Sequence, residues 1–587
     1  MRPAHGNDII LGSIVGKERR PLTLRADERD KHLYVCGATG TGKSKFLENL
    51  IRQDIIGWRK SKCGLLLIDP HGSLFDDLMA WLAWHQPHLK RPVIPIDLRR
   101  KDWVIGYNVL RPRAVADPAV IVSNFVQAMA YVWGQSGTEA TPLFNRWASN
   151  IIGTLYENKL TLLEAEHLTD RMANELRRAM TGKLSNKLAA RDWAYANSLT
   201  PKDFEQQISS TINRLHSFLS TQAIRQMLGQ TGTSLDLGEA LEAGHIILVS
   251  LATEHERVSD EDASLFATLL LNDLWTAAKE RGKGNHGEGV KPFYVYVDEF
   301  QNFVTPTIAK NLDQARGFGL NLTLAHQFPN QLLHTGAHGK QVYDSISVNA
   351  RSKVVFSIEG EENLKPLAQS LFMGAMNPDK IKHELYSTKV MGYVEEYRTA
   401  YARSRSEGHG HGSQSGGSHG EGFGGTILNS SDGLQSRSES WSRFGAESNS
   451  QSNSWSEAAG QSETESPMLI PVMGKELSSV QFESLEEQLF RAMAVLFDQQ
   501  QRQCVVRTVG SRLPVSLHTP TVKEVIRTFE RTERYTQTLL ERCPFALRVV
   551  EAQKRLADRD IQINEQFLPK TVSDEPVTAR RRVRLST

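Results

Sequence analysis

The chain has 587 residues, a formal net charge of +2 and hydrophobic side chains at 40% of its positions. This length predicts two to four domains rather than one. A charge so close to neutral excludes a uniformly basic surface, so any contact with nucleic acid must come from a local patch or a pore lining. The four cysteines show no metal-ligand spacing, and four in 587 residues are too few for a disulfide scaffold, which indicates a reducing compartment.

Membrane-spanning segments are not expected. No stretch reaches the roughly 18 consecutive apolar residues that a membrane helix needs. Residues 120–133 come nearest, but polar residues interrupt them, as in an amphipathic helix. The first twenty residues lack the apolar core of a secretory signal. We therefore expect a cytoplasmic protein, with a peripheral position at the inner membrane through partner proteins as the alternative.

The first 110 residues alternate between strand and helix patterns. Two short strands are expected within 9–24, another at 32–36, a helix at 44–57, and strands at 64–69 and 92–97. The segment 64–69 is a continuous apolar run that ends in an acid, which is typical of a parallel strand buried on both faces. Residues 1–110 are thus interpreted as the first part of an α/β core.

The pattern becomes purely helical at 111–235, which predicts an all-helical insertion domain. Strand and helix patterns then alternate again through 236–402, with strands expected at 245–251, 293–298, 320–325 and 353–358. This alternation favours an α/β fold with a mostly parallel sheet and helices on both faces, interrupted by one long insertion.

The C-terminal third starts with a stretch of low complexity. Residues 403–466 are rich in Ser and Gly and predict a flexible segment, with a polar β-ribbon ordered by assembly as the alternative. A core helix and two strands are expected at 467–520. The region 521–587 is predicted to be helical and ends in the basic cluster Arg580–Arg584, either a solvated tail or a tether for DNA.

A glycine-rich loop follows the strand expected at 32–36 and precedes the helix expected at 44–57. It reads Gly37, Ala38, Thr39, Gly40, Thr41, Gly42, Lys43, Ser44, which fits the P-loop pattern GxxxxGK[ST] in its proper strand–loop–helix context. Backbone N–H groups of such a loop and the helix N-terminus bind phosphate oxygens. We expect ATP here, with Lys43 bridging the β- and γ-phosphates and Ser44 binding Mg²⁺.

Two carboxylates end the strand expected at 293–298. Asp298 is predicted to hold Mg²⁺ through its hydration shell, and Glu299 to orient and polarise the attacking water. Asp69 ends the strand expected at 64–69 and is a further candidate for a position near Mg²⁺ or the water. The alternative for Asp69 is a cap for the helix that follows Gly72.

Three residues around the later strands complete the predicted site. Gln327 follows the strand expected at 320–325 and suits a sensor of the γ-phosphate. Arg316 precedes that strand and is a candidate for an arginine that enters the site of a neighbouring subunit, where it stabilises charge during phosphoryl transfer. Arg351, before the strand expected at 353–358, is the rival candidate for this role, and a plain surface arginine is the alternative for Arg316.

The order of these motifs resembles the HerA–FtsK superfamily of hexameric translocases. The motifs are GATGTGKS, LLLIDPHG, the helical insertion, VYVDEFQNF and ARGFGLNLTLAHQ, and the resemblance covers about residues 9–400 and resumes at 467–520. Within the superfamily the chain is most similar to coupling proteins of type IV secretion and conjugation. The resemblance implies a RecA-like ATPase core, with 1–110 and 236–402 as its two parts.

The resemblance also implies a function. Lys43, Ser44, Asp298, Glu299 and Gln327 match catalytic positions of the family, and Arg316 matches its arginine acting in trans. The family implies a homo-hexamer that moves DNA through a central channel, with a relaxase or secretion-channel proteins as partners. Conjugative coupling proteins usually carry N-terminal membrane helices, which are not expected here. A HerA-like DNA pump with a nuclease partner, and an ATPase adaptor that recruits protein cargo, therefore stay as alternatives.

Overall fold

The computed structural model describes residues 7–16, 20–87, 89, 91–113, 117–135, 142–253, 257–285, 290–303, 305, 312–333, 336–406, 418–429, 435–446, 458–511, 513–525 and 528–568. The chain divides into two units, residues 1–378 with 484–587 and residues 379–483, and each is described by itself. The basic cluster Arg580–Arg584 lies outside the described residues.

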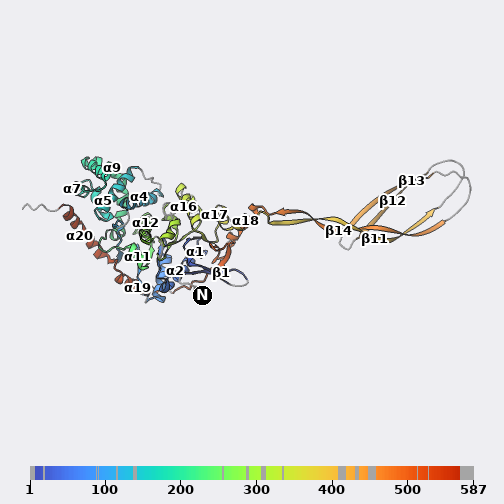
Figure 1. Ribbon diagram of the computed structural model, residues 1–587, viewed down its shortest axis with the longest axis horizontal. Helices are drawn as coiled ribbons and strands as arrows, with labels where there is room; N and C mark the ends of the chain where they lie inside the picture. The colour runs from blue at the N-terminus through green and yellow to red at the C-terminus, as the bar shows by residue number, and fades with distance from the viewer. Residues whose placement is uncertain are drawn as a thin grey trace, which may run out of the picture. The chain divides into compact units, whose positions relative to one another are not determined.

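A central sheet organises the first unit (Figure 1). Its described strands are β1 (Ile9–Ile14), β2 (Pro21–Leu24), β3 (Leu33–Cys36), β4 (Gly64–Asp69), β5 (Val93–Asp97), β7 (Ile246–Ser250), β8 (Phe293–Val297), β9 (Leu320–His326), β10 (Ser352–Phe356), β15 (Gln503–Arg507) and β16 (Val515–His518). Their order is β2-β1-β16-β15-β10-β3-β9-β8-β4-β7-β5. The strands from β10 to β5 are parallel, and those from β15 to β2 add an antiparallel edge. The predicted α/β class with a mostly parallel sheet is confirmed.

Helices cover both faces of this sheet. The side chains of β4 alternate between two cores, with Leu65 and Leu67 on one side and Leu66 and Ile68 on the other. Helices α2 (Lys43–Ser61) and α3 (Ser73–His85) supply the first core. Helices α12 (Asp260–Asn285), α16 (Gly336–Asn349) and α17 (Glu361–Phe372) supply the second. All six residues of β4 are buried, which explains its uninterrupted apolar sequence.

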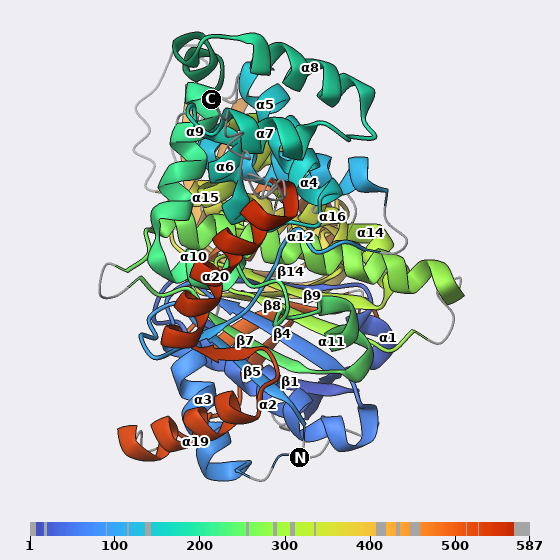
Figure 2. The same cartoon turned by 90° about the vertical axis from the view of Figure 1, so that its left-hand side faces the viewer.

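Helices alone fill the described chain between β6 (Trp103–Ile105) and α11 (Leu237–Ala243). They are α4 (Pro118–Gln135), α5 (Pro142–Glu157), η1 (Leu162–Glu164), α6 (Ala165–Thr169), α7 (Asn174–Thr181), α8 (Lys187–Ser198), α9 (Pro201–Ser220) and α10 (Gln222–Leu228). Their apolar residues are continuous with the core on the α12 face of the sheet. Figures 1 and 2 show α5, α7 and α9 gathered together. The range agrees with the helices expected at 111–235, whose status as a separate domain stays a prediction.

The C-terminal region joins the core to the insertion. It contains α18 (Leu485–Phe497), α19 (Phe529–Arg542), β17 (Ala546–Arg548) and α20 (Val549–Phe567). Strand β17 pairs with β6, so the expected helical region at 521–587 is interrupted there. Beyond it, Arg559 Nε lies 3.1 Å from Glu164 Oε1 of the insertion. Figure 2 shows α20 running beside α10 and α19 near α3.

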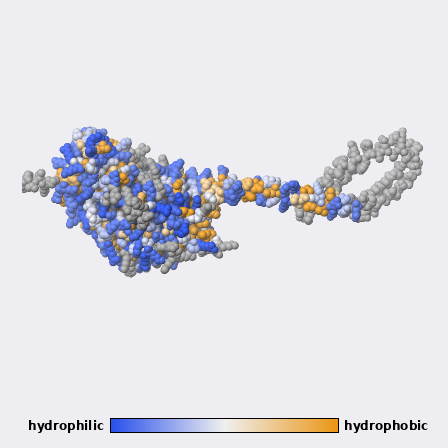
Figure 3. All heavy atoms as spheres, in the orientation of Figure 1, coloured by the Kyte–Doolittle hydropathy of each residue, from blue (hydrophilic) through white to orange (hydrophobic). Residues whose placement is uncertain are grey.

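The second unit consists of long antiparallel strand pairs. Strand β11 (Ile381–Ser406) pairs with β14 (Ala458–Phe482), and β12 (Ser418–Asn429) pairs with β13 (Gln435–Ala446). Strands therefore occupy much of 403–466, which differs from the expected flexible segment and agrees in secondary structure with the β-ribbon alternative. The core was expected to resume at 467. Instead, residues 467–482 pair with β11, and the last pair of this ladder joins Phe482 to Ile381. Exposed apolar side chains line the described part of the pair (Figure 3), including Val394, Met468, Leu469 and Met473.

Candidate functional site

The P-loop connects β3 to α2. Helix α2 begins at Lys43, and Gly42 is its N-cap residue. Gly42 has a φ of 109°, a backbone angle that residues other than glycine rarely adopt. Gly37 is needed for a different reason, because a Cβ atom there would lie 2.6 Å from Cβ of Phe356. The loop thus has the backbone that a phosphate-binding turn at a helix N-terminus requires.

Lys43 brings together the predicted carboxylates from a distant strand. Its Nζ atom lies 2.5 Å from Glu299 Oε1 and 3.2 Å from Asp298 Oδ1, and all three side chains are buried. Burial alone would lower the pKa of Lys43, but the two carboxylates raise it above its usual value. Burial raises the pKa of Asp298 despite the opposing effect of Lys43. The structure therefore brings Lys43, Asp298 and Glu299 together, and their catalytic roles stay predictions.

Glu299 is held in an unusual conformation. Its φ of 48° and ψ of 49° are left-handed, which costs a residue other than glycine about 1 kcal/mol or more. Gln301, in the turn η2 (Phe300–Asn302), donates from Nε2 to Glu299 Oε2 at 3.0 Å. The turn is anchored further by Phe300, which packs against His326 with ring centroids 4.9 Å apart. Gln301 was not singled out in the sequence, although it lies only two residues beyond Glu299.

Asp69 lies beside Asp298, because β4 and β8 are neighbours and the N–H of Asp298 donates to the Ile68 carbonyl at 3.1 Å. Its carboxylate accepts from the N–H of His71 at 3.0 Å and of Phe75 at 2.9 Å. Phe75 is in the first turn of α3, so Asp69 caps that helix from a distance. Burial raises the pKa of Asp69 to about 6, with a further contribution from Asp298.

Replacing Asp69 with Ala is expected to lower the free energy of unfolding by about 1 to 2 kcal/mol, because two backbone N–H groups lose their acceptor. Asp69→Asn, which keeps one oxygen, should lose less. Urea unfolding of the nucleotide-free protein followed by circular dichroism measures both. Equal stability of the Ala variant and the wild type would contradict the capping role.

The end of β9 lies against the P-loop. The His326 carbonyl accepts from the N–H of Gly37 at 3.3 Å, and the Gln327 carbonyl lies 3.5 Å from Cys36 Sγ. The His326 ring is fully buried, and its Nε2 lies 2.5 Å from the Tyr34 hydroxyl. Burial, with Lys43 nearby, lowers the pKa of His326 to about 3, so the ring is neutral. The backbone of Gln327 therefore lies at the sheet edge beside the P-loop, where the γ-phosphate is expected.

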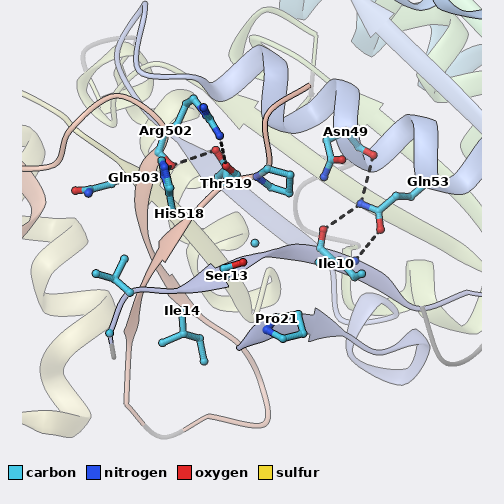
Figure 4. Close-up of a pocket in the computed structure, with 14 residues that line it drawn as sticks. Ile10, Ser13, Ile14, Pro21, Asn49, Gln53, Arg502, Gln503, His518 and Thr519 are labelled. Atoms are coloured by element: carbon cyan, nitrogen blue, oxygen red, sulfur yellow. Dashed lines mark hydrogen bonds between the residues drawn. The ribbon is translucent and has the colours of Figure 1, made fainter. Parts of the chain in front are cut away.

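The outer side of the P-loop is covered by a segment that sequence reasoning missed. Gln501 donates from Nε2 to the Gly40 carbonyl at 3.1 Å, and the N–H of Arg502 donates to the Thr41 carbonyl at 2.9 Å. Arg502 is itself fixed by a hydrogen bond from Nη2 to the Thr519 carbonyl at 2.9 Å (Figure 4). No local motif marks these residues, since they reach the loop only because β15 and β16 join the sheet.

The two candidate arginines lie elsewhere. Arg316 is exposed in η3 (Arg316–Phe318) before β9, and Arg351 is exposed immediately before β10. The opposite ends of these strands adjoin the P-loop, where the Ser357 carbonyl accepts from the N–H of Ala38 at 3.1 Å. Both arginines are thus about one strand length, roughly 15 to 20 Å, from the P-loop of their own chain.

The charges at the site suit a nucleotide with a divalent cation. Lys43 provides one positive charge, whereas Asp69, Asp298 and Glu299 provide three carboxylates at the same sheet edge. The half-buried Ser44 follows Lys43 at the start of α2. Hydroxyl and carboxylate oxygens are the ligands that Mg²⁺ prefers, and backbone N–H groups of the loop suit phosphate. The residues present therefore fit Mg²⁺ and a nucleoside triphosphate.

The parallel sheet, the P-loop and the paired acids beside Lys43 define a P-loop ATPase. A family model described as the type IV secretion-system coupling protein DNA-binding domain matches residues 20–377. The chain belongs to this family. No curated protein matches the chain. Among the described residues, no helix has the length and apolar character needed to cross a membrane.

Solved structures of coupling proteins also resemble the chain. The unbound bacterial conjugative coupling protein TrwBdeltaN70 is 13% identical, with 86% of this chain and 88% of that chain covered and a TM-score of 0.45. The plasmid coupling protein TrwB in complex with ADP and Mg²⁺ gives the same identity and coverage and a TM-score of 0.44. VirB4 of Thermoanaerobacter pseudethanolicus is 12% identical, with coverages of 63% and 89% and a TM-score of 0.39. At these values the family assignment rests on the family model alone.

Proposed function

We propose that this coupling-protein ATPase assembles into a ring of six and uses ATP hydrolysis to move DNA through a central channel. The observation that carries the proposal is the buried cluster of Lys43, Asp298 and Glu299 at the P-loop edge, in a chain whose family is described by a DNA-binding domain. ATP and Mg²⁺ are its cofactors. Movement of DNA suits a protein with little net charge, because a ring repeats each pore-facing cation in every subunit.

Each residue of the cluster has a proposed role. When ATP binds, Lys43 leaves the carboxylates and contacts the β- and γ-phosphates. Ser44 would bind Mg²⁺, Asp298 would hold it through its hydration shell, and Glu299 would polarise the attacking water. Gln327 would contact the γ-phosphate, and Asp69 stabilises the turn between β4 and α3 by accepting from the N–H groups of His71 and Phe75. The ion pair between Lys43 and Glu299 in the nucleotide-free chain keeps both groups neutralised until phosphate replaces the carboxylate.

ATP turnover by the full chain is expected to rise when double-stranded or single-stranded DNA is added at low salt, and the stimulation should fall steeply as salt increases, because phosphate contacts release counterions. Phosphate release measured with each DNA over a salt series tests this. Turnover that neither DNA changes, at any salt, would contradict the translocase. It would favour an adaptor that recruits protein cargo to a secretion channel.

Arg316 is proposed to complete the site of the neighbouring subunit. Arg316→Ala should reduce turnover about a thousandfold while ATP still binds, because the charge of the transition state loses its counterion. The decisive test mixes Arg316→Ala chains with Lys43→Met chains, each inactive alone. Turnover should return at interfaces where the P-loop of an Arg316→Ala chain faces the arginine of a Lys43→Met chain. If the mixture stays inactive although the two chains co-assemble, Arg316 does not act in trans, and the same mixture made with Arg351→Ala tests the rival.

A further inference from the structure

The paired part of β11 and β14 at 381–397 and 467–482, here called the apolar ribbon, exposes apolar side chains (Figure 3). Its segment 467–473 reads Pro, Met, Leu, Ile, Pro, Val, Met, seven residues without a polar side chain. Successive residues of a strand point to opposite faces, so such a run is typical of a strand covered on both faces. Strand β4 has a similar run and is buried throughout. In the ribbon, by contrast, four members of the run are between 45% and 57% exposed, namely Met468, Leu469, Val472 and Met473.

Strand β11 adds apolar side chains to both faces of the ribbon. Tyr393 pairs with Pro471 and Val394 pairs with Ile470 at consecutive positions of the ladder, so the two pairs lie on opposite faces. Tyr393 is 63% exposed and Val394 is 56% exposed. Among the described residues, no third strand pairs with β11 or β14. Because two strands alone are at best marginally stable in water, each face of the ribbon requires a partner.

The prolines of β14 indicate which surface a partner covers. Proline has no backbone N–H, and within a sheet it is confined to positions where no neighbouring strand needs that donor. Pro467 and Pro471 keep their places in the ladder with β11, so the missing donors belong to the outer edge of β14. A further strand at this edge would lack two of its hydrogen bonds. Packing against the faces is therefore favoured over extension of the sheet along β14.

The charges of the ribbon narrow the kind of partner. Residues 381–397 and 467–482 contain three lysines and four glutamates. Lys389 Nζ lies 3.0 Å from Glu476 Oε2 across the ladder, so part of this charge is already paired. DNA and anionic membranes attract an excess of positive charge, which the ribbon lacks. A ribbon with balanced charges can lie beside identical ribbons with little repulsion.

The size of each face suits contact between copies of the chain. Residues 381–397 span about 55 Å at about 3.3 Å per residue, and two strands are about 10 Å wide. Two such faces packed together bury about 1,000 Å² in total, the area at which specific interfaces begin. A two-fold dimer covers one face of each ribbon, whereas a ring gives every ribbon a neighbour on each side. Two apolar faces therefore match a ring better than a dimer.

We propose that the apolar ribbon is an interface between copies of this chain, with each ribbon packed between the ribbons of two neighbours. The proposal rests on the proposed function, since it assigns a contact within the same ring. It gives a role to the unit formed by 379–483, to which none of the proposed nucleotide-site residues belongs. The apolar run at 467–473 is then covered on both faces in the assembly, as β4 is within the central sheet.

A charged substitution on each face of the ribbon tests the proposal in the full-length chain. Tyr393→Glu and Val394→Glu place a carboxylate on opposite faces, where packing would bury it without a partner. Each variant should raise the concentration at which half of the chain is assembled by at least about tenfold. Sedimentation velocity over a concentration series with Mg²⁺ and ATP measures this value. Val550→Glu on α20, where the valine is 77% exposed, is the matched control and should assemble as the wild type does.

Cross-linking tests the same contact without relying on a loss of assembly. Equal positions of packed ribbons lie about 10 Å apart, which a short bis-maleimide can span. Met468→Cys should therefore yield covalent dimers and larger products. Met172→Cys, an exposed change of the same kind in the helical insertion, should yield no more than the wild-type chain with its four native cysteines.

Two results would overturn the ribbon contact and leave the ring of six intact. One is wild-type assembly of both glutamate variants together with no cross-link at Met468→Cys. The other is wild-type binding to phosphatidylcholine vesicles that Tyr393→Glu abolishes, which would assign the faces to lipid. Weakened assembly in only one of the two glutamate variants would overturn the packing on both sides. A wild-type chain that stays monomeric with ATP and DNA would refute the ring itself.

Discussion

Replacing Glu299 with Gln is expected to reduce ATP turnover by a factor of about 100 to 10,000 while ATP binding persists. The carboxylate is the group that polarises the attacking water, and an amide of the same shape lacks the charge to do so. Binding should persist because the P-loop, Lys43 and Asp298 are unchanged. It should even become tighter, since the phosphate no longer competes with the Glu299 carboxylate, 2.5 Å from Lys43 Nζ.

Phosphate release and calorimetric ATP binding measure the two effects on one preparation. Glu175→Gln, an exposed change on α7, serves as the control and should leave both unchanged. If Glu299→Gln retains turnover within a few-fold of the wild type, another group activates the water. Asp69 would then be the next residue to replace, since it is a buried carboxylate beside Asp298.

Replacing Lys43 with Met is expected to abolish ATP binding and also to destabilise the nucleotide-free chain by about 3 to 5 kcal/mol. The change leaves Asp298 and Glu299 buried beside each other without a counterion. Burial already raises the pKa of Asp298, and the loss of Lys43 removes the main opposing interaction. Protonation of Asp298 is then favoured, so the deficit should shrink as the pH falls.

The sign of this effect follows from linkage. A carboxyl whose pKa is higher in the folded than in the unfolded state binds protons on folding, so stability is lost as the pH rises through the folded pKa. Urea unfolding at about pH 8 and about pH 5.5 should therefore show a larger deficit at the higher pH. Adding Asp298→Asn to Lys43→Met should recover part of it, and Lys187→Met on the surface of α8 should have no effect. A deficit that is independent of pH would contradict the unpaired carboxylates as its cause.

The central part of the site could be predicted from sequence because each motif is a short contiguous segment and all of them lie at the carboxyl ends of parallel strands. The P-loop is a contiguous pattern, and Asp298 and Glu299 directly follow an apolar strand. Carboxyl ends of parallel strands meet at one sheet edge, so Lys43 and Glu299 were expected together despite a sequence separation of 256. The strand order that places β9 between β3 and β8 is not contained in either motif.

The unpredicted contacts depend on tertiary pairing or on rare backbone geometry. Gln501 and Arg502 reach the P-loop because β15 pairs with β10, and neither residue belongs to a recognisable pattern. The left-handed backbone of Glu299 could not be predicted from the sequence, because a glutamate rarely adopts this conformation. Strands β12 and β13 agree only with the alternative interpretation, a polar β-ribbon, because the composition of 403–466 resembles that of a flexible segment.

The cover of the P-loop by Gln501 and Arg502 determines when the site is finished during synthesis. The loop is translated well before its cover, which follows some 460 residues later. At typical elongation rates this interval is roughly 20 to 90 s. Strand β3 also waits for its neighbours, because its partners in β9 and β10 follow it by 290 and 319 residues (323 − 33 and 352 − 33). A nascent chain therefore carries an unfinished nucleotide site until Gln501 and Arg502 have been translated, and ATP hydrolysis is expected only after these residues join the sheet.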